Sequence, residues 1–258
     1  PYEMHAMYHA EVAPRLKALT ELPVDHGVTN IKFSGVGESS FQDKLDAAVH
    51  EIHGLEIGYC ARPGELDLRL IGSESNRNAA ANLAIKTYPQ QYINNDGRSL
   101  EETVVHELTE KGLKLSLAES CTGGRISSRI TDVQGSSAVF THGFITYANQ
   151  AKVAMIGVDE DHIETHGAVS EVVAKEMAEG ALKHSGSDIA VSVTGIAGPT
   201  GGTKEKPVGT VWIGISVGNG ERVETSAEMK FYPNGRAVFK QLASQAVLMK
   251  ILRTVREY

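Results

Sequence analysis

Three neighbouring residues with nucleophilic side chains, Ser120, Cys121 and Thr122, lie in the stretch "AESCTGGR". A hydroxyl or a thiolate attacks a carbonyl carbon once a neighbouring base has removed its proton. Gly123 and Gly124 follow directly, and glycines at the start of a helix let a ligand approach backbone N–H groups that bind anions. The simpler interpretation is that Ser120 or Thr122 only caps a helix. The local chemistry permits both interpretations.

A second glycine-rich stretch, "SVTGIAGPTGG", leaves an apolar run and contains Gly195 and Gly198. Ligands collect at the carboxyl ends of strands in α/β sheets, so the two stretches are expected to line one crevice. Their glycine spacing does not fit the dinucleotide fingerprint, and no Gly-Lys pair for a phosphate-binding P-loop occurs. A flexible surface turn is the alternative interpretation.

The stretch "GFITYANQAK" places Tyr147 and Lys152 close together in sequence. A lysine activates a serine only when it is neutral, so burial or a nearby cation must lower its pKa from about 10.4 to about 7–8. An ordinary helix lysine is solvated and charged. Lys152 is therefore a candidate base only if the fold buries it.

Two further patterns are not expected to form sites. "GISVG" matches the nucleophile-elbow pattern, but Ser216 falls inside a predicted strand, whereas the elbow needs a strand-to-helix turn. His162 and His166 are four residues apart, but no third ligand is evident, so no metal site is expected.

Strands and helices alternate from residue 99 onward, which is typical of an α/β domain with a helix-covered sheet. Ser99 and Glu102 form a capping box for a helix that Gly112 ends. Strands are expected over 113–119, 143–148 and 188–195, with a hairpin over 209–231 that turns at 218–220. Helices are expected over 123–130, 149–157, 170–185 (capped by Ser170) and 234–257.

The preceding residues form a smaller α+β unit with the order strand, helix, strand, strand, helix between residues 28 and 88. The turn-rich segment "NNDGRS" separates it from the α/β domain. Apolar residues near the start share one helix face: Met4, Met7, Val12 and Leu16. We therefore expect residues 1–22 to be the tail of a removed domain, 23–95 to be the α+β unit and 96–258 to be the α/β domain.

The composition of the 258 residues, 41% hydrophobic and 22% charged, is that of a globular protein. A net charge of −7 argues against a general nucleic-acid binder. The two cysteines are far apart in sequence, so a reduced, cytoplasmic protein is expected. No apolar run is long enough for a membrane helix, and no membrane association is expected.

Six motifs in a fixed order resemble the C-terminal domain of the CinA (competence/damage-inducible protein) family. They are "AESCTGG", "GSSAVF", "GFITYANQAK", "GAVSE", "VSVTGIAGPTGG" and "KPVGTVWIG". That domain is the nicotinamide-mononucleotide deamidase PncC, and the resemblance covers residues 99–258. The stretches "VTNIKFSGVGES" and "LEIGYCARPGELDLRL" resemble the KH-type middle domain of the same family. The first residues resemble the end of its molybdopterin-binding-like N-terminal domain, whose pyrophosphatase activity is expected to be missing here.

The resemblance implies an amidase that uses a serine–lysine pair, with Ser120 as the nucleophile and Lys152 as its base. Three further residues match polar positions around the pair and are expected to take part in catalysis: Ser137, Tyr147 and Thr194. Residues of the two glycine-rich turns are expected to bind the substrate: Thr122, Gly123, Gly124, Gly195 and Gly198. Arg236 matches an arginine of the family near the start of the last helix, although Lys240 competes for that role. Either turn or the arginine is expected to hold the substrate's phosphate. Nicotinamide mononucleotide would become nicotinate mononucleotide and ammonia, without a metal or an organic cofactor, in a homodimer.

Three alternatives stay open at this point. Cys121 is the rival nucleophile, with His142 as the nearest histidine base in the sequence. The KH-like segment raises nucleic-acid binding, but it lacks a G-x-x-G loop and carries six basic against nine acidic residues. A catalytically silent protein that acts through partners is the third alternative.

Overall fold

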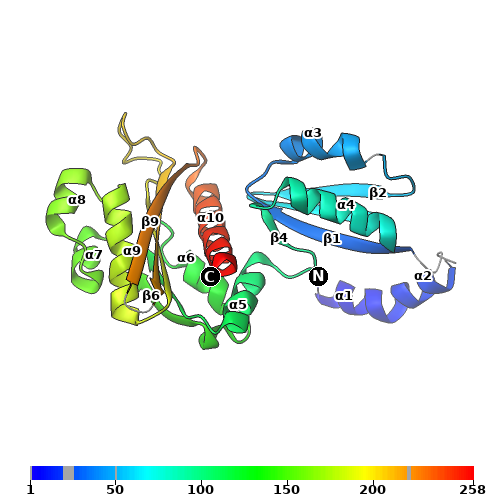
Figure 1. The fold of residues 1–258 in the computed structure, drawn as a ribbon, viewed down its shortest axis with the longest axis horizontal. Coiled ribbons are helices and arrows are strands. Elements are labelled where there is room, and N and C mark those ends of the chain that lie inside the picture. Colours follow the sequence, from blue (N-terminus) through cyan, green and yellow to red (C-terminus); the bar gives the residue numbers. More distant parts are fainter. Residues whose placement is uncertain (1, 20–25, 50, 220–221) are drawn as a thin grey trace.

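The structure is a computed structural model that describes residues 2–19, 26–49, 51–219 and 222–258. These residues form a four-stranded sheet with one hydrophobic core and a five-stranded sheet that contributes to two cores. The two units lie side by side along the long axis of the molecule (Figure 1). The expected class, a small α+β unit followed by a helix-covered α/β sheet, is confirmed.

The N-terminal unit has an antiparallel sheet with the strand order β2-β3-β1-β4. Its elements are β1 (His26–Ser34), α3 (Glu38–Val49), β2 (Glu56–Arg62), β3 (Glu65–Ser73), α4 (Glu74–Thr87) and β4 (Tyr92–Asn94). The two helices share one core with the sheet, where Phe33 of β1 packs against Phe41 of α3. The predicted order of elements from 28 to 88 is found. The three-residue strand β4 was not predicted, because it falls in the segment taken as the end of the unit.

The first residues form a helical segment that makes few contacts with the rest of the chain. It consists of α1 (Tyr2–Met7), the π-helical turn η1 (Tyr8–Val12) and α2 (Ala13–Leu19). The apolar residues predicted to share a face are exposed, including Met4 and Leu16. In the described residues, packing therefore does not explain the apolar pattern of this helix.

The C-terminal unit has the strand order β6-β5-β7-β8-β9. Its strands are β5 (Leu115–Glu119), β6 (Phe140–Ile145), β7 (Ile189–Gly195), β8 (Thr210–Asn219) and β9 (Arg222–Phe231). Strand β5 runs parallel to β6 and β7, while β8 and β9 complete the sheet in antiparallel pairing. The carboxyl ends of β6, β5 and β7 therefore meet at one edge of the sheet, where ligands bind in such folds.

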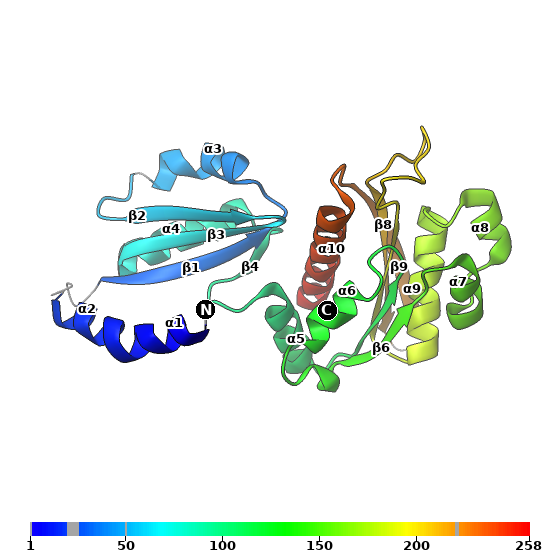
Figure 2. The same cartoon turned by 180° about the vertical axis from the view of Figure 1, so that it is seen from behind.

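Helices cover both faces of this sheet (Figure 2). One layer contains α5 (Leu100–Lys111), α6 (Arg125–Thr131) and α10 (Arg236–Glu257), and the other contains α7 (Asn149–Ile156), α8 (Glu160–His166) and α9 (Glu171–Ser185). A short 3-10 turn, η2 (Ser136–Ala138), precedes β6. Helix α10 buries an apolar stripe that includes Phe239, Val247 and Ile251. Each fully buried side chain of this kind contributes roughly 1.5–3 kcal/mol, so α10 is firmly held with its first turn beside the sheet edge.

The predicted helix boundaries are largely confirmed. The Ser99–Glu102 capping box is present, Gly112 ends α5 in a left-handed conformation, and Ser170 caps α9. Helix α6 begins at Arg125, two residues later than predicted, because Gly123 and Gly124 take positive φ angles of 61° and 90°. The predicted turn at 218–220 includes residue 220, which lies outside the described residues.

Three residues of α10 donate hydrogen bonds to described residues of the N-terminal unit. Gln245 Nε2 donates to Glu65 Oε1 at 2.8 Å, Arg253 Nε donates to the Gln90 carbonyl at 2.8 Å, and Arg256 Nη1 donates to the Tyr92 carbonyl at 2.9 Å.

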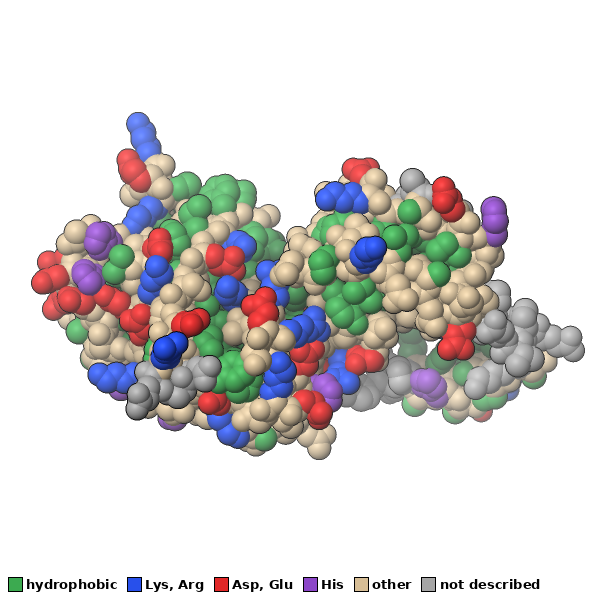
Figure 3. Space-filling view, viewed as in Figure 1, with side chains coloured by type: hydrophobic (Ala, Val, Ile, Leu, Met, Phe, Trp, Pro, Cys, Tyr) green, Lys and Arg blue, Asp and Glu red, His purple; other side chains and the backbone are tan. Residues whose placement is uncertain are grey.

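The space-filling view shows Lys and Arg interspersed with Asp and Glu on the face in Figure 3, with no continuous basic stripe on that face. Among the described residues, no helix has the length and apolarity needed to cross a membrane.

Candidate active site

Residues far apart in sequence meet at the carboxyl ends of β5, β6 and β7. Ser120 follows β5, Tyr147 follows β6 and Thr194 lies at the end of β7. They line one pocket of about 200 Å³ together with Cys121, Lys152, Gly195 and Arg236. Four further residues that were not singled out from the sequence also line it: Asn149, Ala168, Val169 and Ala197. They stand inside the quoted motifs, but their side chains gave no chemical reason to assign them to the site.

Lys152 and Ser120 are in direct contact in this pocket. Nζ of Lys152 lies 3.1 Å from Oγ of Ser120, and the lysine side chain is 1% exposed. Two backbone carbonyls also accept from this nitrogen, that of Thr146 at 2.8 Å and that of Tyr147 at 3.5 Å. The short α7 buries Lys152 against the sheet because it follows β6 after only three residues.

Burial lowers the pKa of the Lys152 ammonium from 10.5 to about 8. No carboxylate is hydrogen-bonded to Nζ within the described residues. At pH 7 about a tenth of the lysine is therefore neutral, a fraction that reaches about a half at pH 8.

The three partners of Nζ suit a neutral amine. A neutral amine has two protons and one lone pair. When the protons point to the Thr146 and Tyr147 carbonyls, which can only accept, the lone pair faces the hydroxyl of Ser120. This arrangement can remove the serine proton.

A buried carboxylate, Glu119, fixes the turn that carries Ser120. Its side chain is 0% exposed and accepts from the N–H groups of Gly124, Ile126 and Ser127 at 3.0, 3.1 and 2.8 Å, and from the Ser127 hydroxyl at 2.7 Å. A carboxylate that receives several hydrogen bonds from a helix start stabilises that helix. Glu119 was not predicted from the sequence, although an acid directly before the serine of a glycine-rich turn is a visible signal.

The same contacts correct the expected role of the helix start. The N–H groups of Gly124, Ile126 and Ser127 face Glu119 and are not free for an anionic ligand. Thr122 is fully buried, and its hydroxyl has no hydrogen-bond partner among the described residues. Gly123 is exposed, next to the side chain of Lys240.

Cys121 is poorly placed to act as the nucleophile. Burial, together with the nearby charge of Glu119, raises the pKa of its thiol to about 12. The proposed histidine partner is remote, since His142 pairs with Ser116, at the far end of β5 from the pocket. Four residues of strand span about 13 Å, so His142 cannot reach the Cys121 thiol.

Arg236, the first residue of α10, reaches the pocket. Its guanidinium donates to the Tyr147 hydroxyl at 2.8 Å and to the Gly198 carbonyl at 3.2 Å. Tyr147 is 58% exposed, and its hydroxyl makes no hydrogen bond to Ser120 or Lys152. Lys240 lies one turn further along α10 and is not among the lining residues.

The second glycine-rich stretch frames the opposite wall. The Thr194 hydroxyl donates to the Ala168 carbonyl at 2.8 Å and so joins β7 to the loop before α9. Gly195 lines the pocket, and a Cβ atom there would lie 2.8 Å from the Thr210 carbonyl oxygen. Gly198 takes a φ of 70° and contributes its carbonyl to Arg236. Gly195 is thus required by its neighbours and Gly198 by its backbone angle.

Ser137 is not brought together with the other predicted residues in this chain. It is exposed in η2, directly before β6, and the register pairs Phe140 with Leu115 at the start of β5. Ser120 follows the other end of β5. A strand length therefore separates the two serines.

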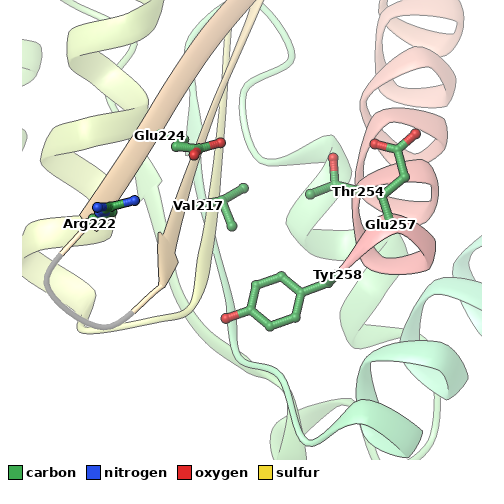
Figure 4. A pocket seen from close by; sticks show the side chains of 6 residues that line it. All are labelled: Val217, Arg222, Glu224, Thr254, Glu257 and Tyr258. Carbon is green, nitrogen blue, oxygen red and sulfur yellow. The ribbon is translucent and has the colours of Figure 1, made fainter.

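The patterns set aside from the sequence form no site. Ser216 lies inside β8 and shares a hydrogen bond with Thr225 of β9. Within the described part of the chain, no group of histidines, cysteines and acids could hold a metal ion. A larger pocket of about 360 Å³, which includes Val217 and Tyr258, lies at the opposite end of the sheet (Figure 4). The predicted nucleophile and base do not line it.

Comparison with known families agrees with the two units. The family model described as the CinA C-terminal domain matches residues 97–255, and the model described as the damage-inducible protein CinA KH domain matches residues 29–90. A CinA-like protein of Akkermansia muciniphila is 46% identical over 258 residues, which are 100% of this chain and 61% of that protein. A putative competence-damage inducible protein of Caldicellulosiruptor saccharolyticus is 42% identical over 100% of this chain and 63% of its own length. The chain thus spans about three-fifths of the length of these curated relatives.

Solved structures resemble the C-terminal unit. Competence/damage inducible protein CihA from Agrobacterium tumefaciens is 42% identical with a TM-score of 0.56, and the match covers 61% of this chain and 93% of that one. A CinA superfamily protein from Klebsiella pneumoniae is 28% identical with a TM-score of 0.57, over 62% of this chain and 97% of that one. The resemblance inferred from the six motifs is confirmed.

Proposed function

The chain belongs to the CinA family, and from this premise we propose that its C-terminal unit is a nicotinamide-nucleotide amidase. The reaction converts nicotinamide mononucleotide and water into nicotinate mononucleotide and ammonia. The observation that carries the proposal is the contact between a buried, largely uncompensated lysine and a serine hydroxyl in a pocket at the carboxyl ends of parallel strands.

In the first half of the reaction, neutral Lys152 accepts the proton of Ser120 while Oγ attacks the carboxamide carbon of the substrate. The carbonyl π bond opens, and the resulting tetrahedral oxyanion carries the negative charge. Lys152 then returns its proton to the amide nitrogen, the C–N bond breaks and ammonia leaves. The product of this half is an ester between Ser120 and the nicotinoyl group.

In the second half, Lys152 takes a proton from water as the water oxygen attacks the ester carbon. Collapse of the second tetrahedral intermediate breaks the bond to Oγ, and the proton returns to Ser120. The acid product leaves as nicotinate mononucleotide. One lysine serves both halves because it exchanges protons with the serine, the leaving group and water in turn.

Backbone N–H groups are available for the oxyanion. Cys121 and Ala197 line the pocket, and neither N–H makes a hydrogen bond to another described residue. One such donor is typically worth about 10²–10³ in rate. Glu119 acts through the turn, since its hydrogen bonds keep the residues after Ser120 in place.

The hydroxyl of Tyr147 makes no hydrogen bond to Ser120 or Lys152. Its hydroxyl receives a hydrogen bond from Arg236, and its backbone carbonyl contacts Lys152. We assign it to substrate positioning at the mouth of the pocket.

The homodimer implied by the family resemblance stays a prediction, as does any activity of the longer relatives.

The test is ammonia release from nicotinamide mononucleotide by the purified chain and by three variants. Ser120→Ala and Lys152→Met should each abolish release, while Cys121→Ala should retain most of it. Release that disappears with Cys121→Ala but persists with Ser120→Ala would assign the chemistry to the thiol. Absence of release from the unaltered chain would favour a silent family member.

A further inference from the structure

Three basic side chains come from the first residue of α6 and the first turns of α10, and we call them the basic rim: Arg125, Arg236 and Lys240. Arg125 donates to the neutral amide oxygen of Gln241. Arg236 donates to the Gly198 carbonyl and the Tyr147 hydroxyl, which are also neutral acceptors. Lys240 makes no hydrogen bond or ion pair with any described residue.

Lys240 lies directly against the turn that carries the proposed nucleophile. Its Nζ is 3.7 Å from the point where a Cβ on Gly123 would stand. Its charge also acts on the Cys121 thiol, whose pKa it lowers slightly against the larger effect of burial. Arg236 and Lys240 are four residues apart, so they share one face of α10 with a rise of about 6 Å between them.

No carboxylate in the described part of the chain pairs with the basic rim. Glu119, the acid closest in sequence to the turn, is fully buried and already accepts four hydrogen bonds. The basic residues elsewhere often have acidic partners, such as Arg129 with Glu101 and Arg256 with Glu107. In a chain with a net charge of −7, an unpaired group of cations marks a place that attracts an anion.

We propose that Lys240, assisted by Arg236, binds the phosphate monoester of the substrate. The inference rests on the proposed function, because it assumes that the carboxamide of the same molecule lies at Ser120. A phosphate has several acceptor oxygens, and a lysine ammonium and an arginine guanidinium are its usual protein partners. The exposed, side-chain-free Gly123 leaves space for the phosphate beside the turn.

This placement makes the site selective for a nucleotide over its nucleoside. Nicotinamide riboside carries the same carboxamide and ring but no phosphate, so it cannot make the proposed contacts with the basic rim. A hydrogen bond to a charged group is worth enough to change affinity by about ten- to a hundred-fold. Arg236 has a second role at Tyr147, so Lys240 is the cleaner position to test.

The experiment measures binding in the Ser120→Ala background, where no turnover consumes the ligand. Isothermal titration compares nicotinamide mononucleotide with nicotinamide riboside for three chains: the background, Lys240→Met and the control Lys250→Met. Lys250 lies on the same helix, about 15 Å further along, and is also half-buried. Lys240→Met should weaken mononucleotide binding about ten- to a hundred-fold and riboside binding less than about two-fold. Lys250→Met should change neither.

Two additions keep the result decisive. Lys240→Arg retains the charge and should retain most of the preference for the mononucleotide. Inorganic phosphate should compete with the mononucleotide in the background chain and lose most of that effect in Lys240→Met. Equal weakening of both ligands by Lys240→Met, or no weakening of either, would overturn the inference while leaving the amidase proposal intact.

Failure of the amidase proposal gives a different pattern. If the unaltered chain releases no ammonia but binds inorganic phosphate through Lys240, the phosphate site stands and the proposed reaction fails. If neither the mononucleotide nor inorganic phosphate depends on Lys240, the inference is wrong regardless of activity.

Discussion

Replacing Lys152 with methionine should abolish activity and at the same time stabilise the C-terminal unit at neutral pH. The substitution keeps the length and the apolar stem of a side chain that is 1% exposed, and it removes the amine. Burial holds the pKa of Lys152 at about 8 instead of 10.5. At about 1.4 kcal/mol per pKa unit, burial of the charged lysine lowers the free energy of unfolding at pH 7 by about 3 kcal/mol.

The lost hydrogen bonds reduce that gain. Nζ contacts the Thr146 carbonyl and the Ser120 hydroxyl, and each contact contributes about 1 kcal/mol. The net expectation is a variant that is about 1–2 kcal/mol more stable at pH 7. Most substitutions of a residue this deeply buried are destabilising, so the direction alone is informative.

The dependence on pH follows from the two pKa values. Between about pH 8 and 10.5 the unfolded chain binds a proton on Lys152 that the folded chain has lost, so the stability of the unaltered protein rises with pH relative to the variant. Below pH 8 the advantage of Lys152→Met is therefore constant, and across this window it shrinks. Near pH 10.5 the two chains should differ in stability only by the hydrogen bonds that Lys152→Met has lost, so the variant should be the less stable of the two.

Urea unfolding at several pH values between 7 and 10 provides the assay. The chain has one tryptophan, Trp212 in β8, so its fluorescence reports on the sheet of the C-terminal unit. Lys250→Met serves as the control for removal of a positive charge from a half-buried position. A Lys152→Met chain that is less stable at pH 7, by an amount that does not change up to pH 10, would refute the reasoning, because Lys152 would then be charged and stabilised in the folded state.

Three further predictions concern the neighbouring residues. The rate kcat/KM should rise with pH and level off above an apparent pKa of about 8, because only neutral Lys152 accepts the serine proton; a pH–rate profile that is flat from 6.5 to 9 would contradict this. Cys121→Ser should retain activity within a few-fold and lose about 1–2 kcal/mol of stability, since the thiol is buried and un-ionised; loss of all ammonia release in a folded variant would speak against it. Glu119→Gln should lower both kcat and the free energy of unfolding, the latter by about 2–3 kcal/mol, because an amide nitrogen would face N–H donors. A fully active variant with an unchanged melting temperature would show that the four hydrogen bonds are dispensable.

Local pattern and capping chemistry predicted most of the elements. The capping box at Ser99 and the apolar run before Thr194 were sufficient to place α5 and β7. Helix α6 begins later than predicted because two glycines with positive φ precede it. Strand β4 is only three residues long, too short for a periodic pattern to show.

The site was only partly predictable, because its chemistry depends on burial. Nothing in the sequence around Lys152 distinguishes a buried lysine from a solvated one, and the family resemblance supplied its role. Glu119 acquires four donors only when the turn folds back over the end of β5. Ser137 matches a family motif but lies at the other end of the strand pair, a relation that only the register reveals. The position of Lys240 against Gly123 depends on how α10 packs, which no local pattern gives.

The most direct test of the central claim is the mass of the intact protein during turnover. Rapid acid quenching of the chain with nicotinamide mononucleotide should reveal a population heavier by the substrate less ammonia, and peptide mapping should place the adduct on Ser120. Lys152→Met and Ser120→Ala should show no adduct. An adduct on Cys121, or steady ammonia release with no covalent species at any quench time and no dependence on Ser120, would contradict the serine–lysine account.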